Sequence, residues 1–104
     1  MSVIQLVKND TAPRIYFTLK QDGTPIDLTD ATIKFIFRKQ GAATNLFSRD
    51  CVVEDVAGGV CYYDWQSGDL VNTGAHRGEV EITFADGKVQ TCKDLLRFDV
   101  RDEL

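Results

Sequence analysis

The chain has few of the residues from which catalytic and metal sites are built. Its 104 residues include three cysteines and a single histidine, His76. A hydrolytic triad requires a histidine base, and the sequence has no G-x-S-x-G motif for its nucleophile. Zinc sites require histidines and cysteines at short, recognisable spacings, which this chain lacks. We therefore predict no catalytic activity, no metal and no cofactor, and we expect His76 to be a solvated loop residue.

The chain also has no excess of basic residues and no long apolar segment. Twelve Lys and Arg stand against 16 Asp and Glu, which gives a net charge of −4. Sequence-independent binding of nucleic acid depends on clustered positive charge, so nucleic acid is not an expected partner. A transmembrane helix needs about 18 apolar residues in a row, and the N-terminus has no signal-peptide pattern. We predict a protein made in a cytoplasm, with no membrane partner.

Cysteine is scarce, and its positions follow no redox or metal motif. Cys51, Cys61 and Cys92 are odd in number, and none of them forms a C-x-x-C pair. Because a cytoplasm keeps thiols reduced, we predict three free cysteines that are dispensable for function. The alternative is a disulfide between Cys51 and Cys61, which would face each other across a hairpin.

What the sequence has in abundance is apolar alternation with a period of two residues. The alternating segments are bounded by Gly, Asp and Pro, and no long crossover segment separates them, which favours antiparallel pairing. We predict an all-β fold: an antiparallel immunoglobulin-like β-sandwich of about seven to nine strands, in a single domain over residues 1–104. The expected strands are residues 3–7, 14–20, 32–38, 46–48, 51–54, 60–65, 78–84, 88–91 and 95–101.

The phase of the alternation identifies a candidate core. In the clearest segment, residues 78–84, Val80, Ile82 and Phe84 share one face while Glu79 and Glu81 share the other. The longest stretch without alternation, residues 66–74, is interpreted as a loop with one helical turn. The same rule, applied along the chain, predicts that these residues are buried between facing sheets: Ile15, Phe17, Ile33, Phe35, Phe37, Val80, Ile82, Phe84, Phe98 and Val100.

Two segments break the rule that a sheet is apolar inside and polar outside. Ile36 is apolar on an otherwise charged face, and segment 60–65 is apolar on both faces. Large apolar groups on an outer face indicate a partner, and Tyr and Trp are typical interface anchors. We predict a partner-binding surface on this outer face and the adjoining loop 66–77, with Ile36, Tyr63, Trp65, Leu70, His76 and Arg77. Alternatively, Trp65, Tyr62 and Tyr63 form a sugar-stacking platform or belong to the core.

The acidic residues have two interpretations. Asp22, Asp27 and Asp30 are close enough in sequence to suggest calcium ligands, but their spacing does not match a calcium loop and turn roles explain them. Glu79 and Glu81 project from one face, as the paired carboxylates of sugar hydrolases do, yet alternating charges also keep a solvated sheet face soluble.

Four turn-and-strand motifs follow one another along most of the chain. They are KNDTAP at residues 8–13 with the strand IYFTL at 15–19, DGTPIDLTDATIKF at 22–35, GVCYY at 59–63, and GEVEITF at 78–84 followed by DGK. Their order resembles the N-terminal domain of phage baseplate upper proteins, an immunoglobulin-like module of the tails of phages that infect Gram-positive bacteria.

This resemblance implies a function without an active site. It indicates a structural protein of a phage or prophage virion, made in the bacterial host cytoplasm. Its implied role is a docking module of the tail or baseplate. The implied partners are other phage structural proteins, with a homo-oligomer in the assembled particle left open. The alternative is a β-sandwich module that binds a carbohydrate or another component of the host surface.

Overall fold

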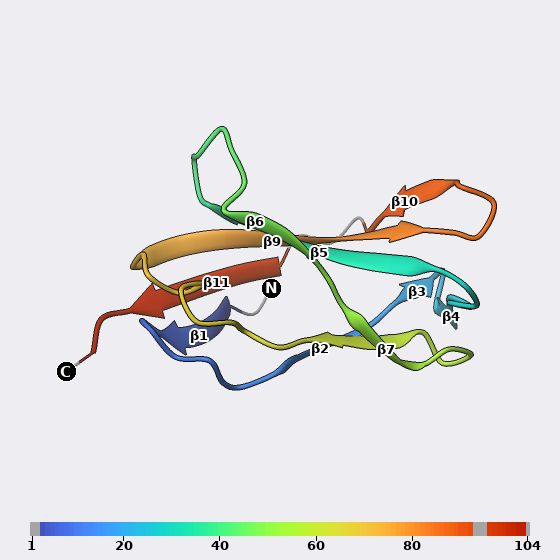
Figure 1. Cartoon of the computed structure of the whole chain (residues 1–104), viewed down its shortest axis with the longest axis horizontal. Helices are drawn as coiled ribbons and strands as arrows, with labels where there is room; N and C mark the ends of the chain where they lie inside the picture. Colours follow the sequence, from blue (N-terminus) through green and yellow to red (C-terminus); the bar gives the residue numbers. More distant parts are fainter. Residues whose placement is uncertain (1–2, 93–95, 104) are drawn as a thin grey trace.

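A computed structural model of the chain describes residues 3–92 and 96–103, and these residues form strands and turns but no helix, hence none that could cross a membrane. The strands lie in two layers (Figure 1). They are β1 (Val3–Val7), β2 (Ile15–Thr18), β3 (Lys20–Gln21), β4 (Thr24–Pro25), β5 (Thr32–Lys39), β6 (Phe47–Asp50), β7 (Val52–Asp55), β8 (Val60–Tyr63), β9 (Gly74–Thr83), β10 (Val89–Thr91) and β11 (Leu96–Arg101). The predicted all-β, mainly antiparallel sandwich is confirmed.

The described residues contain eleven strands, two more than the upper prediction. The predicted strand 14–20 is divided at Leu19, whose amide donates to the Gly59 carbonyl at 2.8 Å and whose carbonyl accepts from the Ile26 amide at 2.9 Å. Leu19 therefore leaves the β2 ladder, and the chain forms the small hairpin β3–β4 beyond it. The predicted start of the last strand, Leu95, lies outside the described residues.

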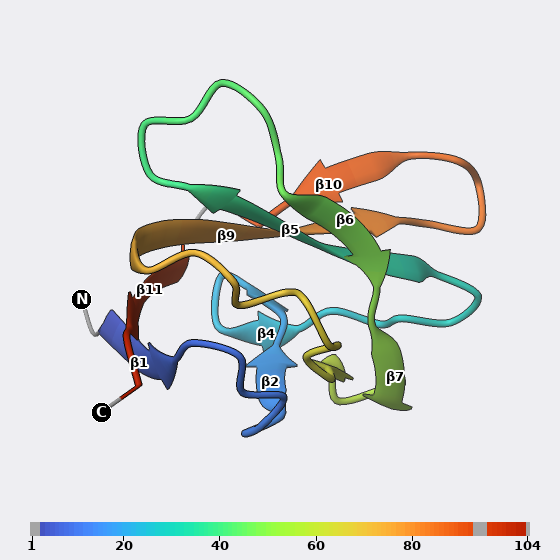
Figure 2. The same ribbon diagram turned by 60° about the vertical axis from the view of Figure 1, so that its left-hand side comes forward.

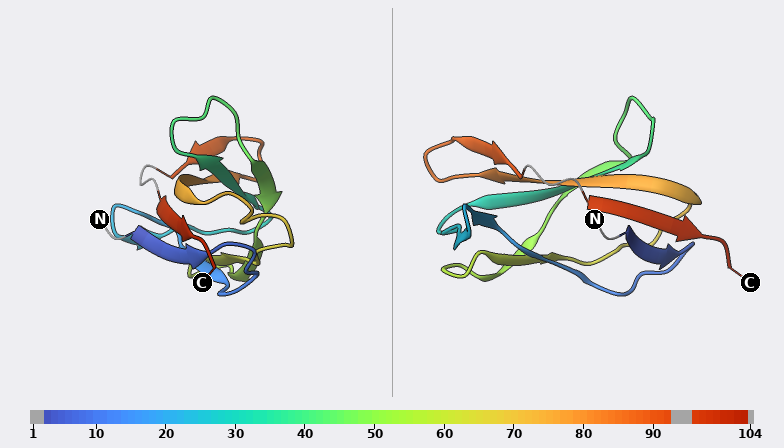
Figure 3. Two further views of the ribbon diagram at one scale, coloured as in Figure 1. Left: turned by 90° about the vertical axis from the view of Figure 1, so that its left-hand side faces the viewer. Right: turned by 180° about the vertical axis from the view of Figure 1, so that it is seen from behind.

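The larger sheet has the order β1-β11-β9-β5-β6, with β10 beside the second half of β9. All of its pairs are antiparallel except the pair of β1 with β11, which runs parallel from Val3 opposite Arg97 to Val7 opposite Arg101. Figure 3 shows the two strands side by side with the same direction. The first strand thus forms one edge of the sheet, and the last strand is its neighbour.

The smaller sheet has the order β2-β8-β7, and the segment from β6 to β7 runs directly into it from the larger sheet. β6 pairs with β5 in the larger sheet, and β7 pairs with β8 in the smaller one. Between them the amide of Cys51 donates to the carbonyl of Ile33 at 2.8 Å. The chain therefore crosses from layer to layer at Cys51 and closes one side of the sandwich (Figure 2).

The core lies between the two layers and is largely the predicted one. Nine of the ten predicted residues are buried, whereas Phe84 lies just past the end of β9 and is half-buried. Seven further apolar residues complete the core: Leu6, Leu19, Leu28, Cys61, Tyr63, Trp65 and Leu70. Phe35 lies at its centre.

The segment between β8 and β9 differs from the prediction. No helical turn forms; instead the amide of Asp69 donates to the carbonyl of Gln66 at 3.0 Å and closes a turn. β9 begins at Gly74 rather than Gly78, because its first residues pair with β11 on one side and β5 on the other. His76 and Arg77 therefore lie on a strand and not in a loop.

Candidate functional site

The predicted partner-binding face is not assembled as one surface. Tyr63, Trp65, Leu70 and His76 have exposed fractions of 2%, 3%, 1% and 1%. The prediction that they are outward-facing is wrong, since the inner phase of β8 is Cys61 and Tyr63, and Trp65 continues that phase just beyond the strand. These four residues help to build the core.

The ring contacts of Trp65 show what this region does instead. Its indole packs edge-on against Phe35 at 5.7 Å, Phe37 at 5.2 Å and Phe98 at 5.8 Å between ring centroids. Tyr63 packs edge-on against the same indole at 5.5 Å. The proposed platform of Trp65, Tyr62 and Tyr63 therefore does not exist, because two of its three members lie inside the sandwich.

A charged network that the sequence did not predict fixes the turn after β8. The Asp69 side chain is 1% exposed and forms an ion pair with Arg49 of β6. Its Oδ2 also accepts from the Tyr63 hydroxyl at 2.6 Å and from the Gln66 amide at 2.8 Å. Burial, and then the bond to Asp69, raise the pKa of Tyr63, so its hydroxyl remains a donor. The network links both sheets to this turn.

His76 is buried, which corrects the prediction of a solvated loop residue. Its ring stacks on Phe37 with centroids 4.9 Å apart and an interplanar angle of 2°, and Nδ1 lies 2.9 Å from the Gly74 carbonyl. Burial lowers the pKa of His76; the hydrogen bond with the Gly74 carbonyl raises it to a lesser extent, and the charges of Lys39, which lowers it, and Asp99, which raises it, have smaller effects. The ring is therefore held as a neutral part of the core.

The lowered pKa of His76 predicts a loss of stability on acidification. Between about pH 7 and pH 5 the unfolded chain takes up a proton at this histidine, while the folded protein resists it. Denaturant unfolding across this window should show falling stability for the wild type and a flatter profile for His76→Gln. Asp27, whose pKa is lowered by its hydrogen bonds with Thr29, titrates below this window. Identical profiles for both proteins would contradict the prediction.

The outer face of the smaller sheet carries a polar and aromatic cluster. Arg14 Nε donates to Asp64 Oδ1 at 2.6 Å and its Nη2 to Oδ2 at 3.2 Å, and the guanidinium lies 3.9 Å from the Tyr62 ring centroid. The ring centroids of Tyr62 and Tyr16 are 5.7 Å apart, and Tyr16 is 54% exposed. The outward-facing tyrosine of β8 is thus Tyr62, which is half-buried and lies one residue away from the predicted Tyr63.

Ile36 and Arg77, the remaining predicted contact residues, line one groove of about 340 Å³ on the larger sheet. The groove lies beside the loop between β5 and β6, which stands away from the sandwich (Figure 2). Arg38 Nε donates to Asn45 Oδ1 of this loop at 3.0 Å. Gly41, Ala42, Gly78 and Glu79 complete the lining. The lining of the groove therefore combines one apolar side chain, Ile36, with two arginines, Arg38 and Arg77.

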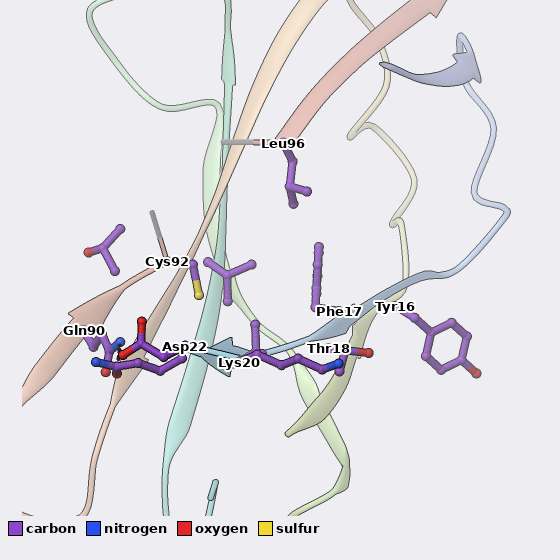
Figure 4. Close-up of a pocket in the computed structure, with 12 residues that line it drawn as sticks. Tyr16, Phe17, Thr18, Lys20, Asp22, Gln90, Cys92 and Leu96 are labelled. Atoms are coloured by element: carbon purple, nitrogen blue, oxygen red, sulfur yellow. Dashed lines mark hydrogen bonds between the residues drawn. The ribbon is translucent and has the colours of Figure 1, made fainter. Parts of the chain in front are cut away.

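A second hollow, of about 590 Å³, opens where β2 and β3 approach β9 and β10. Figure 4 shows Asp22 and Gln90 at one end of it, Lys20 between Asp22 and Thr18, and the Tyr16 ring directed away at the other end. Gln90 Nε2 donates to Gln21 Oε1 at 2.9 Å across this opening. Its lining combines apolar side chains with a few amide and charged groups.

The acidic residues occupy turn and surface positions. Asp27 Oδ1 accepts from the Thr29 amide at 2.9 Å and from its hydroxyl at 2.6 Å, and Asp22 and Asp30 have φ values of 52° and 54°. Within the described residues, no three His, Cys, Asp or Glu are placed to hold a metal ion. Glu79 lies opposite Ile36 and Glu81 opposite Lys34, in separate rows of the sheet.

Cys51 and Cys61 are free thiols in the structure, and they lie close together. Cys51 and Cys61 hydrogen-bond to each other; this bond, together with burial, raises the pKa of Cys51, and the same bond lowers that of Cys61. Cys61 lies opposite Val53 in the ladder, so the two thiols meet diagonally at the crossing between sheets. Reduced, dispensable thiols remain a prediction.

Comparison with known proteins supports the resemblance seen in the sequence. The family model of the BppU N-terminal domain matches residues 2–104. No curated protein matches the chain significantly. Among solved structures, CopC from Methylosinus trichosporium OB3b is similar with a TM-score of 0.58 and 8% identity, over 100% of this chain and 88% of that one, which shows a shared fold alone. The chain belongs to the BppU N-terminal domain family of phage baseplate upper proteins.

Proposed function

We propose that the protein is a non-enzymatic docking module of a phage or prophage tail or baseplate, with other structural proteins of the particle as its partners. The observation that carries this proposal is the family match over residues 2–104. In this role residues 1–104 act as one domain, made in the bacterial host and assembled into the virion. A homo-oligomer in the assembled particle is compatible with this role and stays open, and the proposed partners include neither nucleic acid nor a membrane.

The geometry supports docking in two ways. The buried network and aromatic core make a rigid support, and the grooves lie on its outer surfaces. The partner-binding residues that remain from the sequence prediction are Ile36 and Arg77, which share one groove. Tyr63, Trp65, Leu70 and His76 support that surface from inside.

A particle experiment tests this function. We expect the protein to co-purify with intact tails and to be found in them by mass spectrometry, and we expect deletion of its gene to yield particles that lack baseplate parts. The purified protein mixed with neighbouring tail proteins should form a complex detectable by light scattering. Absence from the particles, together with normal assembly in the deletion mutant, would contradict the proposal.

A carbohydrate-binding module is the second candidate. The exposed Tyr16 ring and the half-buried Tyr62 ring beside the Arg14–Asp64 pair favour it, because they combine an aromatic surface with charged hydrogen-bonding groups. Binding on a glycan array that is lost in Tyr16→Ala, without any complex with tail proteins, would replace docking by host-surface recognition.

A further inference from the structure

Three arginines lie in one cross-strand row on the outer face of the larger sheet. Arg38 of β5 is directly opposite Arg77 of β9, and Arg77 is directly opposite Arg97 of β11. Their sequence neighbours Phe37, His76 and Phe98 are buried, so the arginines alternate to the outer face. We call Arg38, Arg77 and Arg97 the arginine row.

The arginine row is unfavourable in the isolated protein. Like charges directly opposite each other in a sheet repel, because their Cβ atoms are only about 5 Å apart. Among the described residues the ion pairs are Arg14–Asp64 and Arg49–Asp69, and neither includes a member of the row. The chain as a whole carries a net charge of −4, so an excess of arginine does not account for this arrangement.

Another cross-strand row on the same face has the charge arrangement that is usual in sheets. Lys34 lies between Asp50 on β6 and Glu81 on β9, so the charges alternate across the strands. Such opposite-charge pairs support a sheet, whereas the arginine row opposes it. A group from outside the chain that supplies negative charge would relieve the repulsion.

The groove beside the row indicates which kind of negatively charged group would fit there. Arg38 and Arg77 line it together with Ile36, and Asn45 holds the Arg38 side chain from the β5–β6 loop. The planar fork of a guanidinium binds a carboxylate through two parallel hydrogen bonds. The groove therefore offers two guanidinium groups, Arg38 and Arg77, for carboxylates and one apolar side chain, Ile36, for a neighbouring apolar group.

We propose that the arginine row docks an acidic segment of a partner protein, with Asp or Glu carboxylates lying between neighbouring arginines. Strands are about 4.8 Å apart, so the row spans about 10 Å, which suits two carboxylates on one face of an extended segment. Glu79 of β9 and Asp99 of β11 occupy the next outward positions on opposite sides of the row, so the positive strip is one row wide. Their carboxylates would repel a broad polyanion such as duplex nucleic acid. This proposal rests on the docking function and specifies its face.

Binding of a fluorescein-labelled oligoglutamate peptide, measured by anisotropy at low salt, tests the row. The wild-type chain is expected to bind, and Arg38→Gln, Arg77→Gln and Arg97→Gln should each weaken binding by about tenfold. The matched control is Lys88→Gln, which removes the same charge from the exposed turn between β9 and β10 and should bind as the wild type does. Added salt should weaken binding, because exposed charges are screened.

Thermal unfolding at low salt gives an independent readout. The triple glutamine variant should unfold at the wild-type temperature or above it, because the repulsion is removed. A lower unfolding temperature would mean that the arginines support the fold, and the proposal would be wrong. Equal peptide binding by the wild type and the triple variant would also overturn it.

Two further outcomes identify a different occupant and overturn the proposal. Tighter binding of a duplex DNA oligonucleotide, lost in the triple variant, would assign the row to nucleic acid. Self-association in light scattering that depends on the row, without peptide binding, would assign it to a second copy of the chain. Normal incorporation of the triple variant into particles would refute the proposed role of the arginine row but not the docking function. Absence of the wild-type protein from particles would refute the docking function itself.

Discussion

Truncation of Phe35 to alanine is expected to destabilise the protein by about 3–5 kcal/mol. Phe35 is fully buried, and its ring centroid lies within 6 Å of six others. These rings come from both layers: Phe17 and Tyr63 from the smaller sheet, Phe37, Phe47 and Phe98 from the larger one, and Trp65 after β8. Removal of this ring leaves a cavity that neither sheet can fill without moving.

Urea unfolding of the wild type and Phe35→Ala measures this loss as a change in the free energy of unfolding. The control is Tyr16→Ala, which also removes an aromatic ring from a strand, but one that is 54% exposed. We expect that substitution to cost about 1 kcal/mol or less. Similar losses for both variants would show that the central position of Phe35 has no special energetic weight.

Removal of the Asp69 carboxylate is expected to have the second largest effect. Asp69→Ala leaves the Tyr63 hydroxyl and the Gln66 amide without their acceptor and removes the ion partner of Arg49. Breaking a buried pair costs about 3–5 kcal/mol, and we expect about 2–4 here because the Arg49 side chain is 36% exposed and regains water.

Thermal and urea unfolding of Asp69→Ala should be compared with Asp64→Ala. Asp64 also pairs with an arginine, but Arg14 and Asp64 lie on the exposed face of the smaller sheet. The loss at Asp64 should be much smaller, since exposed ion pairs contribute little. Limited proteolysis should in addition cut residues 66–73 faster in Asp69→Ala. An unchanged cleavage rate would show that the network does not fix this turn.

Alternation predicted the core wherever only one face of a strand is apolar. In β9, Val80 and Ile82 alternate with Glu79 and Glu81, and the first pair is buried. In β5 the inner residues were likewise identified although Ile36 breaks the pattern. The physical reason is that burial of charged side chains is so costly that they fix the phase of a strand.

The phase of β8 could not be predicted in this way, because both of its faces are apolar. Val60 and Tyr62 alternate with Cys61 and Tyr63, and no charge distinguishes the faces. The error at Tyr63 extended to Trp65, so both aromatic residues of the predicted surface were placed on the wrong face. Only the packing of the two sheets determines that Tyr63 is inside.

The arginine row and the start of β9 depend on contacts between distant segments. Gly74 to Arg77 contain no apolar alternation, and they form a strand because β5 and β11 pair with them on both sides. The row results from the registers of three strands, which no local pattern reports. A charge count gives −4 and hides the positive strip entirely.

The parallel pairing of β1 with β11 has a mechanical consequence. A pulling force applied between Val3 and Arg101 acts along both strands in opposite directions, because the chain enters at one end of the pair and leaves at the other. The hydrogen bonds between the two strands lie across this force and must break together rather than one at a time. The domain can therefore transmit tension through its first and last strands while the aromatic interior bears little of the load.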